Sequence, residues 1–301
     1  MIRMTTNVYE AQLVTHAGVF HADEVLATVI LEELFENVVV CRTLKVPKDL
    51  KSDVIVYDIG GGRWDHHQKG GNGVRENGIP YASAGLIWND FGMRLLKKKY
   101  INSKSLWSAV EKMLIQGIDA VDNGIVTIPR PEISVMNISQ VISDFNPTWD
   151  EDESFDKAFK EACEFAKKVF NNTLKKAMSS LKAKSYIEEA IEKSRNHIMI
   201  LEKYVSWSRS LYFSRNPKAL EVWFVIYPSL RGGYNWQVVT TDLKQHIPMK
   251  AVPDNWLGLK GKEYQEVTGV KTALFCHHGG FVGAAETQED AIKLAEIAIT
   301  S

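Results

Sequence analysis

Residues 15–24 read T-H-A-G-V-F-H-A-D-E and bring His16, His21, Asp23 and Glu24 into one short stretch. Imidazole and carboxylate groups are ligands for manganese, magnesium and catalytic zinc. No cysteine lies nearby to favour a structural zinc site built from thiolates. The stretch therefore predicts a site for a divalent metal.

Three later segments supply groups of the same types. Asp58 ends an apolar run, and the carboxyl ends of parallel strands are where α/β proteins bind ligands. His66 and His67 are neighbours in an extended segment, so their side chains should point in opposite directions, one to metal and one to substrate. Asp119 and Asp122 lie three residues apart in an expected helix and can face one site.

This combination is rich enough in ligands for two metals bridged by one acid, an arrangement that activates water and neutralises a phosphoryl transition state. The sequence has eight histidines, and six of them fall in three short motifs flanked by glycine. The other two, His197 and His246, are expected to be ordinary surface or core residues.

The elements around these groups predict an α/β protein whose N-terminal domain has a parallel sheet. Strands are expected at 12–14, 37–42 and 53–60, with a helix from about residue 25 between the first two. A helix over 83–100, with Ser83 as its N-cap, and another from 103 or 105 to 118 should follow.

Residues 151–207 are rich in lysine and glutamate with helical periodicity, and they predict a helical connector. Strand patterns return at 220–227, 236–240 and 272–277, and a final helix is expected over 288–299. The predicted organisation is therefore a catalytic domain over 1–150, the connector over 151–207 and a smaller α/β substrate-binding domain over 208–301.

The composition is that of an ordinary globular protein, with 301 residues, 45% hydrophobic and 24% charged. A net charge of -1 excludes the broad basic surface of a general nucleic-acid binder, so a nucleic acid must be held locally. Three widely spaced cysteines (Cys41, Cys163 and Cys276) indicate core residues in a reducing compartment. The chain has no signal-peptide core and no apolar run of membrane-spanning length, so we expect a cytoplasmic protein without a membrane partner.

Several motifs together resemble the DHH phosphoesterase superfamily and, within it, the melanocyte-proliferating-gene (MYG1-type) exonuclease family. They are Thr-His-x-Gly-x-Phe-His-x-Asp-Glu over 15–24, Asp-His-His-Gln over 65–68, Ser-Ala-Gly-Leu over 83–86, Asp-x-x-Asp-Asn-Gly-Ile over 119–125 and Ala-Val-Pro over 251–253. The resemblance covers nearly the whole chain.

The resemblance implies a metal-dependent phosphodiester hydrolase, with family members described as 3′ to 5′ exonucleases acting on RNA. It also implies roles for individual residues. His16, His21 and Asp23 would bind metal, with His21 and Asp23 on different ions. Asp58 would bridge the ions, His66 would be a ligand and His67 would face the phosphate. The last acid would be Asp119 or Asp122. Two Mn²⁺ are expected. His21 stands where the superfamily commonly has aspartate, so Mg²⁺ and Zn²⁺ stay open.

In the C-terminal domain, His277, His278, Gly279 and Gly280 resemble the superfamily's glycine-rich substrate-binding motif, where backbone N–H groups can hold a phosphate. Arg231 precedes two glycines and is a second phosphate-binding candidate, because a guanidinium can bind two phosphate oxygens at once. An exposed loop arginine is the alternative for Arg231. Trp236 and Trp256 are expected in the core.

We hypothesise a hydrolase that uses a water activated by two metals, with the substrate held between its two domains. The expected substrate is single-stranded RNA or a short oligonucleotide cleaved from its 3′ end, and a homodimer is considered. Asp58, His66 and His67 are the expected catalytic residues. The alternatives are a phosphohydrolase for pyrophosphate or a small nucleotide, and a non-catalytic metal- or nucleotide-binding module.

Overall fold

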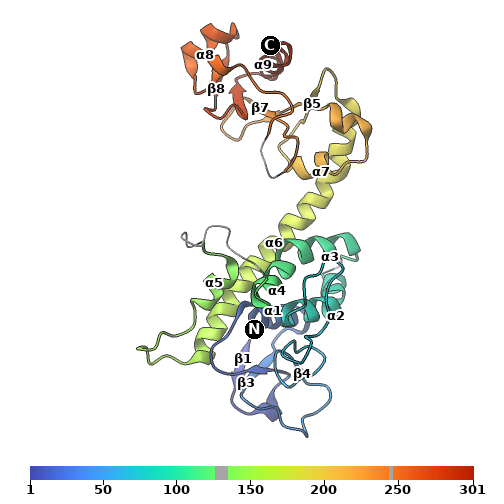
Figure 1. Ribbon diagram of the computed structural model, residues 1–301, viewed down its shortest axis with the longest axis vertical. Helices are drawn as coiled ribbons and strands as arrows, with labels where there is room; N and C mark the ends of the chain where they lie inside the picture. Colours follow the sequence, from blue (N-terminus) through green and yellow to red (C-terminus); the bar gives the residue numbers. More distant parts are fainter. Residues whose placement is uncertain (100, 126–134, 244–246) are drawn as a thin grey trace. The chain divides into compact units, whose positions relative to one another are not determined.

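The computed structural model describes residues 1–99, 101–125, 135–243 and 247–301. The chain divides into two compact units, Met1–Met178 and Ser179–Ser301, here called unit 1 and unit 2. Figure 1 labels their elements. Two residues of the sequence analysis, Tyr100 and His246, lie outside the described residues.

Unit 1 contains a four-stranded sheet with the order β1-β3-β2-β4. All of its pairings are parallel, which confirms the expected parallel sheet. The strands are β1 (Arg3–Thr5), β2 (Leu13–His16), β3 (Val39–Thr43) and β4 (Ile55–Val56). The sequence analysis did not predict β1, a three-residue strand too short for a pattern.

Strand β4 is shorter than the run expected over 53–60. Beyond Val56, Tyr57 forms only an isolated bridge to Trp64, and Asp58 turns to a positive φ of 58°. The chain therefore leaves the sheet just where the candidate acid stands.

Helix α1 (Ala22–Phe35) follows β2 and is buried from Ala22 to Glu32. A helix that is apolar around most of its circumference must be covered on several sides. It packs against α2 (Ser83–Lys98), and its Val25 carbonyl lies beside the Cys163 thiol of α6 (Phe155–Lys193). The first turn of α1 is thereby fixed in the interior, together with the acids that it carries.

Helix α2 (Ser83–Lys98) covers α1, with Ile87, Trp88, Leu95 and Leu96 buried. The expectation that Ser83 caps this helix is wrong, because Ala82 is the N-cap and the Ser83 hydroxyl binds Asp58 instead. The next helical segment comprises α3 (Lys104–Val110), a π-helical turn (Glu111–Ile115) and α4 (Gln116–Asp122), and α5 (Ile138–Ser143) follows.

Helix α6 (Phe155–Lys193) is 39 residues long. Within unit 1 it places Phe159 against Phe20 and Phe170 against Trp88. Within unit 2 its Ile187 and Ile191 pack with Met199 and Val225. The expectation of helix throughout 151–207 is wrong beyond Lys193, because the β-branched run that follows forms β5 (Ile198–Ile200) and pairs with β6.

Unit 2 contains a five-stranded mixed sheet with the order β5-β6-β7-β9-β8. The other strands are β6 (Phe224–Pro228), β7 (Tyr234–Val238), β8 (Ala273–Cys276) and β9 (Val282–Ala285). The helices are α7 (Ser208–Tyr212), α8 (Gly261–Thr268) and α9 (Gln288–Thr300). The sequence analysis did not predict β9, because its Val-Gly-Ala-Ala sequence has little strand character.

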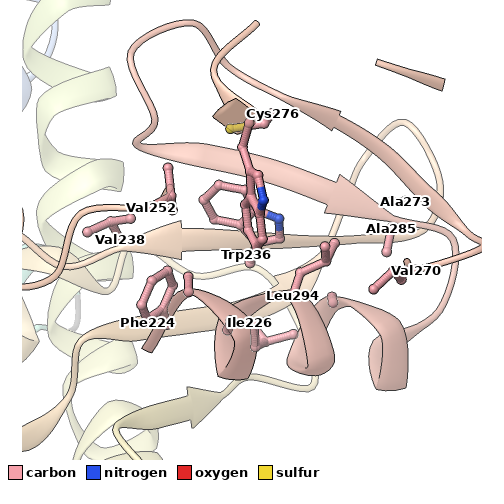
Figure 2. Packing of buried hydrophobic residues seen from close by; sticks show 14 of the residues in the cluster. Phe224, Ile226, Trp236, Val238, Val252, Val270, Ala273, Cys276, Ala285 and Leu294 are labelled. Carbon is pink, nitrogen blue, oxygen red and sulfur yellow. The ribbon is translucent and has the colours of Figure 1, made fainter. Parts of the chain in front are cut away.

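The core of unit 2 lies between the sheet and α9. Figure 2 shows Trp236 of β7 at the centre of this core, with Phe224 and Ile226 of β6 and Leu294 of α9 around it. Trp236 and Trp256 are buried as expected, and so are all three cysteines. Among the described residues, no helix is long and apolar enough to cross a membrane.

Candidate metal centre

The first part of the centre is the turn between β2 and α1. His16 is the last residue of β2, His21 is the N-cap of α1, and Asp23 and Glu24 lie in its first turn. The Glu24 carboxylate accepts hydrogen bonds from the His21 backbone N–H at 2.8 and 2.9 Å. Acids are favoured there because the free N–H groups of a helix N-terminus carry partial positive charge.

Asp58 comes next, directly after β4, in the left-handed region that few residues other than glycine adopt. Its side chain is buried, and Oδ1 accepts a hydrogen bond of 2.9 Å from the Ser83 hydroxyl at the start of α2. Two elements thus hold this carboxylate in a strained conformation of the kind that clusters at functional sites.

Imidazole rings surround Asp58. His16 Nε2 lies 3.2 Å from Asp58 Oδ2 and 2.9 Å from Glu24 Oε1. His66 Nε2 lies 3.2 Å from both Asp58 Oδ1 and Asp122 Oδ2. The same nitrogen of His66 is 3.7 Å from Asp23 Oδ2.

His67 also approaches Asp58, with its Nδ1 at 3.3 Å from Oδ1. The rings of His66 and His67 are 4.1 Å apart, so the expectation that these neighbours point in opposite directions is wrong. The backbone there is irregular rather than a strand. Asp65 holds this bend, since its carboxylate accepts from the backbone N–H groups of His67 and Gly61 at 2.9 and 2.7 Å.

The ligand atoms converge in overlapping groups, each within 4.8 Å. The groups are His16-His21-Glu24, Asp58-His66-His67, His21-Asp23-Asp122 and Asp23-Glu24-Asp58.

Three buried atoms here, Asp23 Oδ1, Asp58 Oδ2 and His66 Nε2, make no hydrogen bond. Buried polar atoms nearly always have a hydrogen-bond partner. Imidazole nitrogens and carboxylate oxygens that lie close together without hydrogen-bond geometry are arranged as the ligands of a metal ion would be. The residues therefore fit a divalent cation.

The pKa values of the cluster also favour a site for a cation. Burial lowers the pKa of His16, but the carboxylates of Asp58 and Glu24 outweigh burial and raise that pKa to about 10. Burial opposes ionisation of Asp58, yet contacts with three imidazoles hold its pKa far below the usual value. Burial and then the neighbouring charges of Asp58 and Glu24 raise the pKa of Asp23. The raised pKa of Asp23 reflects carboxylates buried side by side, an arrangement that a bound cation would stabilise.

Asp119 lies apart from these groups. Its carboxylate accepts hydrogen bonds from the Arg75 guanidinium at 2.6 Å and from the backbone N–H of Gly85 at 3.1 Å. Arg75 also binds Glu111. A Cβ at position 85 would collide with Asp119 and Arg75, so only glycine lets α2 approach this ion pair. Of the two acids considered from sequence, Asp122 lies in the cluster, whereas Asp119 forms an ion pair with Arg75.

Two cavities of unit 1 reach the cluster. One, of about 510 Å³, is lined by His21, His66, His67 and Asp122 together with amide and hydroxyl groups of α5 and its N-cap. The other, of about 390 Å³, lies beside Asp58 and His16. His21 and His67 line both cavities. A polar molecule of nucleotide size can therefore reach the candidate ligands.

In unit 2, the four motif residues from His277 to Gly280 form the turn between β8 and β9. His277 Nδ1 accepts the Gly279 backbone N–H at 3.0 Å, and Gly280 has a positive φ of 66°. Arg231 lies in the turn between β6 and β7. Because β7 and β9 pair as Tyr234 with Ala285 and Gln237 with Val282, these two turns lie at opposite ends of the sheet. The structure therefore does not bring Arg231 to the His277 turn.

Sequence reasoning missed the structural roles of three residues: Glu24 and Ser83, which contact the cluster, and Arg75, which binds Asp119 outside it. Glu24 was only part of a motif, although its place three residues after His21 is the signal of a capping box. Ser83 was taken as a cap. Arg75 carried no local signal, since its partner Asp119 is 44 residues away.

Of the two histidines outside the motifs, His197 stacks on Trp223 with ring centroids 3.7 Å apart. Its Nδ1 lies 2.7 Å from the Glu221 carbonyl oxygen. These contacts give His197 the ordinary structural role expected of it.

Comparison with known proteins gives a consistent result. A MYG1 exonuclease family model, described as an uncharacterised protein family (UPF0160), matches residues 12–299. The chain is 30% identical to MYG1 protein YER156C of Saccharomyces cerevisiae, covering 96% of this chain and 95% of that protein. It is 29% identical to human MYG1 exonuclease, covering 93% and 84%. No solved structure matches at a significant level. The chain belongs to the MYG1 exonuclease family.

Proposed function

We propose that this protein is a metal-dependent phosphodiester hydrolase that shortens single-stranded RNA or short oligonucleotides from the 3′ end. The observation that carries the proposal is the convergence of four carboxylates, Asp58 among them, with four imidazoles, and the buried ligand atoms among these that lack hydrogen bonds. The name exonuclease, borne by the human relative, supports a nucleic-acid substrate.

We assign two divalent cations to the cluster, because His16, His21 and Glu24 supply one group of ligands and Asp58 with His66 supplies another. Bound cations of this kind activate water and neutralise phosphoryl oxygens. Asp58 contacts imidazoles on both sides, which suits a bridging carboxylate. Asp23 and Asp122 complete the set. Mn²⁺ is the proposed ion, and Mg²⁺ and Zn²⁺ are the alternatives that the same ligands accept.

His67 takes a different role in this proposal. Its side chain is 57% exposed, the most of the rings that contact Asp58, and it lines both cavities. Contact with Asp58 raises the pKa of His67 to about 9, so its ring carries a positive charge at neutral pH. A charged, accessible imidazole can donate a hydrogen bond to a phosphate oxygen and offset its charge.

Unit 1 thus carries the metal chemistry, and we assign substrate binding to unit 2 through its exposed turns. The local exposed groups proposed for this are His278, Gly279 and Arg231. Because the net charge is only -1, binding must depend on such local groups rather than on a general basic surface.

The test uses metal-stripped protein and single-stranded RNA labelled at either end, with Mn²⁺, Mg²⁺ or Zn²⁺ added in turn. We expect metal-dependent shortening from the 3′ end. Asp58→Ala should lose more than about a hundredfold in rate, because even residues that only support a ligand contribute ten- to a hundredfold. Asp152→Ala, on the surface of the same unit, is the matched control.

Retained turnover in metal-loaded Asp58→Ala would falsify the assignment of this centre. A rival function, hydrolysis of pyrophosphate or a small nucleotide, is favoured by the moderate size of the cavity of about 510 Å³ at the cluster. The same protein preparation, assayed on these compounds beside RNA, separates the two functions. Turnover of neither would leave a non-catalytic binding module.

A further inference from the structure

The sheet of unit 2 has two different faces. One face packs on α9 through Phe224, Ile226 and Trp236 (Figure 2). Side chains alternate along a strand, so Asn235 and Gln237 point to the opposite face. There Asn235 pairs with Ala284, and Ala284 pairs with Phe275, which places these three residues side by side across β7, β9 and β8. They line a cavity of about 520 Å³.

Aromatic rings border this cavity. Phe275 is 36% exposed and Tyr204 is 55% exposed, although both lie against a packed sheet. The Tyr204 ring lies 5.2 Å from that of Tyr227, and the Tyr227 hydroxyl donates to Gln237 Oε1 at 2.7 Å. Between Phe275 and the tyrosines, the small side chain of Ala284 leaves room. The cavity therefore offers exposed ring surface in a fixed position.

A cation lies at the same cavity. Arg231, in the turn between β6 and β7, is exposed and lines it. Among the described residues, none forms an ion pair with the Arg231 guanidinium, and the cavity lining contains no carboxylate. The turn itself is tightly set, since Ser229 and Gly233 are hydrogen bonded at 2.9 Å and a Cβ on Gly233 would collide with the Ala285 carbonyl. The backbone that carries the arginine at this edge of the cavity is thus fixed.

We propose that this cavity binds one nucleotide unit of a single-stranded nucleic acid, with the base against Phe275 and Tyr204 and the phosphate at Arg231. Stacking on aromatic rings is available to every base, and an unpaired guanidinium next to a lining without carboxylates suits a phosphate. An apolar peptide or lipid would leave the guanidinium without a partner. The proposal rests on the function proposed above and identifies where unit 2 binds its substrate.

This site is distinct from the His277 turn, which lies at the other end of the sheet. A nucleotide bound here would explain why an exposed arginine, Arg231, and an exposed phenylalanine, Phe275, line the same cavity. The two turns then contact different parts of the nucleic acid.

Binding is measured by anisotropy of a fluorescein-labelled six-nucleotide RNA in EDTA, so that cleavage does not interfere. We expect Phe275→Leu and Arg231→Gln each to weaken affinity about tenfold or more, which is the scale of a single stacked base. Phe275→Trp should retain affinity. The matched controls are Phe213→Leu and Arg215→Gln, exposed residues of unit 2 outside the cavity. Unchanged thermal unfolding of the variants shows that the fold is intact.

Wild-type affinity in both Phe275→Leu and Arg231→Gln would overturn the proposal, even if the protein degrades RNA. Absence of RNA binding by the wild-type protein would also overturn it. If wild-type protein binds RNA in EDTA but no metal ion produces cleavage, the proposed hydrolysis is wrong. The affinities of the variants then still show whether the cavity binds RNA. A change in sedimentation of Phe275→Leu with unchanged RNA affinity would assign this face to contact between two copies of the chain, against the proposal.

Discussion

The metal centre of unit 1 and the core of unit 2 bury very different groups. Around Asp58, carboxylates and imidazoles lie close together, several of their atoms lack hydrogen bonds, and Asp58 itself has a strained backbone. Around Trp236, the buried cluster consists of apolar and aromatic side chains packed between a sheet and a helix. A bound cation would stabilise the first arrangement, whereas packing alone stabilises the second.

This difference shows how the chain divides its tasks. Like charges buried together cost stability, so a protein keeps them only where binding or catalysis needs them. The helices that hold the centre, α1, α2 and α6, are correspondingly well packed. Removing packing in unit 2 and removing charge in unit 1 should therefore have opposite effects on stability.

The largest effect on stability is expected from Trp236→Ala. This side chain is fully buried, and truncation of a buried aromatic residue costs about 3–5 kcal/mol. Chemical denaturation measures the loss. Trp149→Ala is the matched control, because Trp149 is 97% exposed and its removal should change stability by less than about 0.5 kcal/mol. Equal losses in the two variants would contradict the assignment of the core.

Ser83→Ala tests the support of Asp58. The variant loses the hydroxyl that donates to Asp58 Oδ1 at 2.9 Å, and it should bind the activating metal about ten- to a hundredfold more weakly. Isothermal titration calorimetry with Mn²⁺ measures this change. Ser180→Ala, on the exposed side of α6, should bind metal as the wild type does. Wild-type affinity in Ser83→Ala would show that Asp58 needs no support from α2.

Asp23→Asn tests the repulsion within the cluster. Asparagine can still accept the Ser83 N–H now bound by Asp23 Oδ2, but it removes a buried charge next to Asp58 and Glu24. The metal-free variant should therefore be more stable than the wild type, because the raised pKa of Asp23 shows that burial and its acidic neighbours oppose the ionised carboxylate. Metal should no longer raise its unfolding temperature as much. A less stable metal-free variant would mean that the carboxylate is a net stabilising group.

The stability of the metal-free protein should also depend on pH. The pKa of His16 is raised to about 10 and that of His67 to about 9, against about 6.5 in an unfolded chain. The protonated rings therefore contribute stability that is fully present below about pH 6.5 and is lost as the pH rises through 9 to 10. Metal binding requires neutral rings, so its affinity should rise with pH.

Denaturation at pH 7 and at about pH 9.5, with and without metal, separates these effects. Metal-free protein should lose stability at the higher pH more than metal-loaded protein does. Because His67 is 57% exposed, solvent screens its share and His16 should account for most of the change. Equal losses in both forms would place the titrating groups elsewhere.

The sequence predicted which local stretches carry the chemistry, and for a physical reason. Imidazole and carboxylate spacing, the β-branched run before His16 and the apolar run after Glu24 are all local properties of the chain. They were enough to predict the parallel sheet, α1 and α2 and, through resemblance, the family. They were not enough for β1 and β9, whose short sequences form strands only beside a partner.

Only the tertiary structure decided how the stretches meet. From the local sequence, Asp119 and Asp122 were equally suitable as the last metal ligand. The structure distinguishes them, because Arg75 from a distant loop forms an ion pair with Asp119. Ser83 looks like a helix cap until Asp58 is placed beside it. Arg231 and the His277 motif were two phosphate-binding candidates, and strand register placed them at opposite ends of a sheet. Such choices depend on contacts between residues far apart in sequence, because burial and charge pairing become fixed only when those residues pack together.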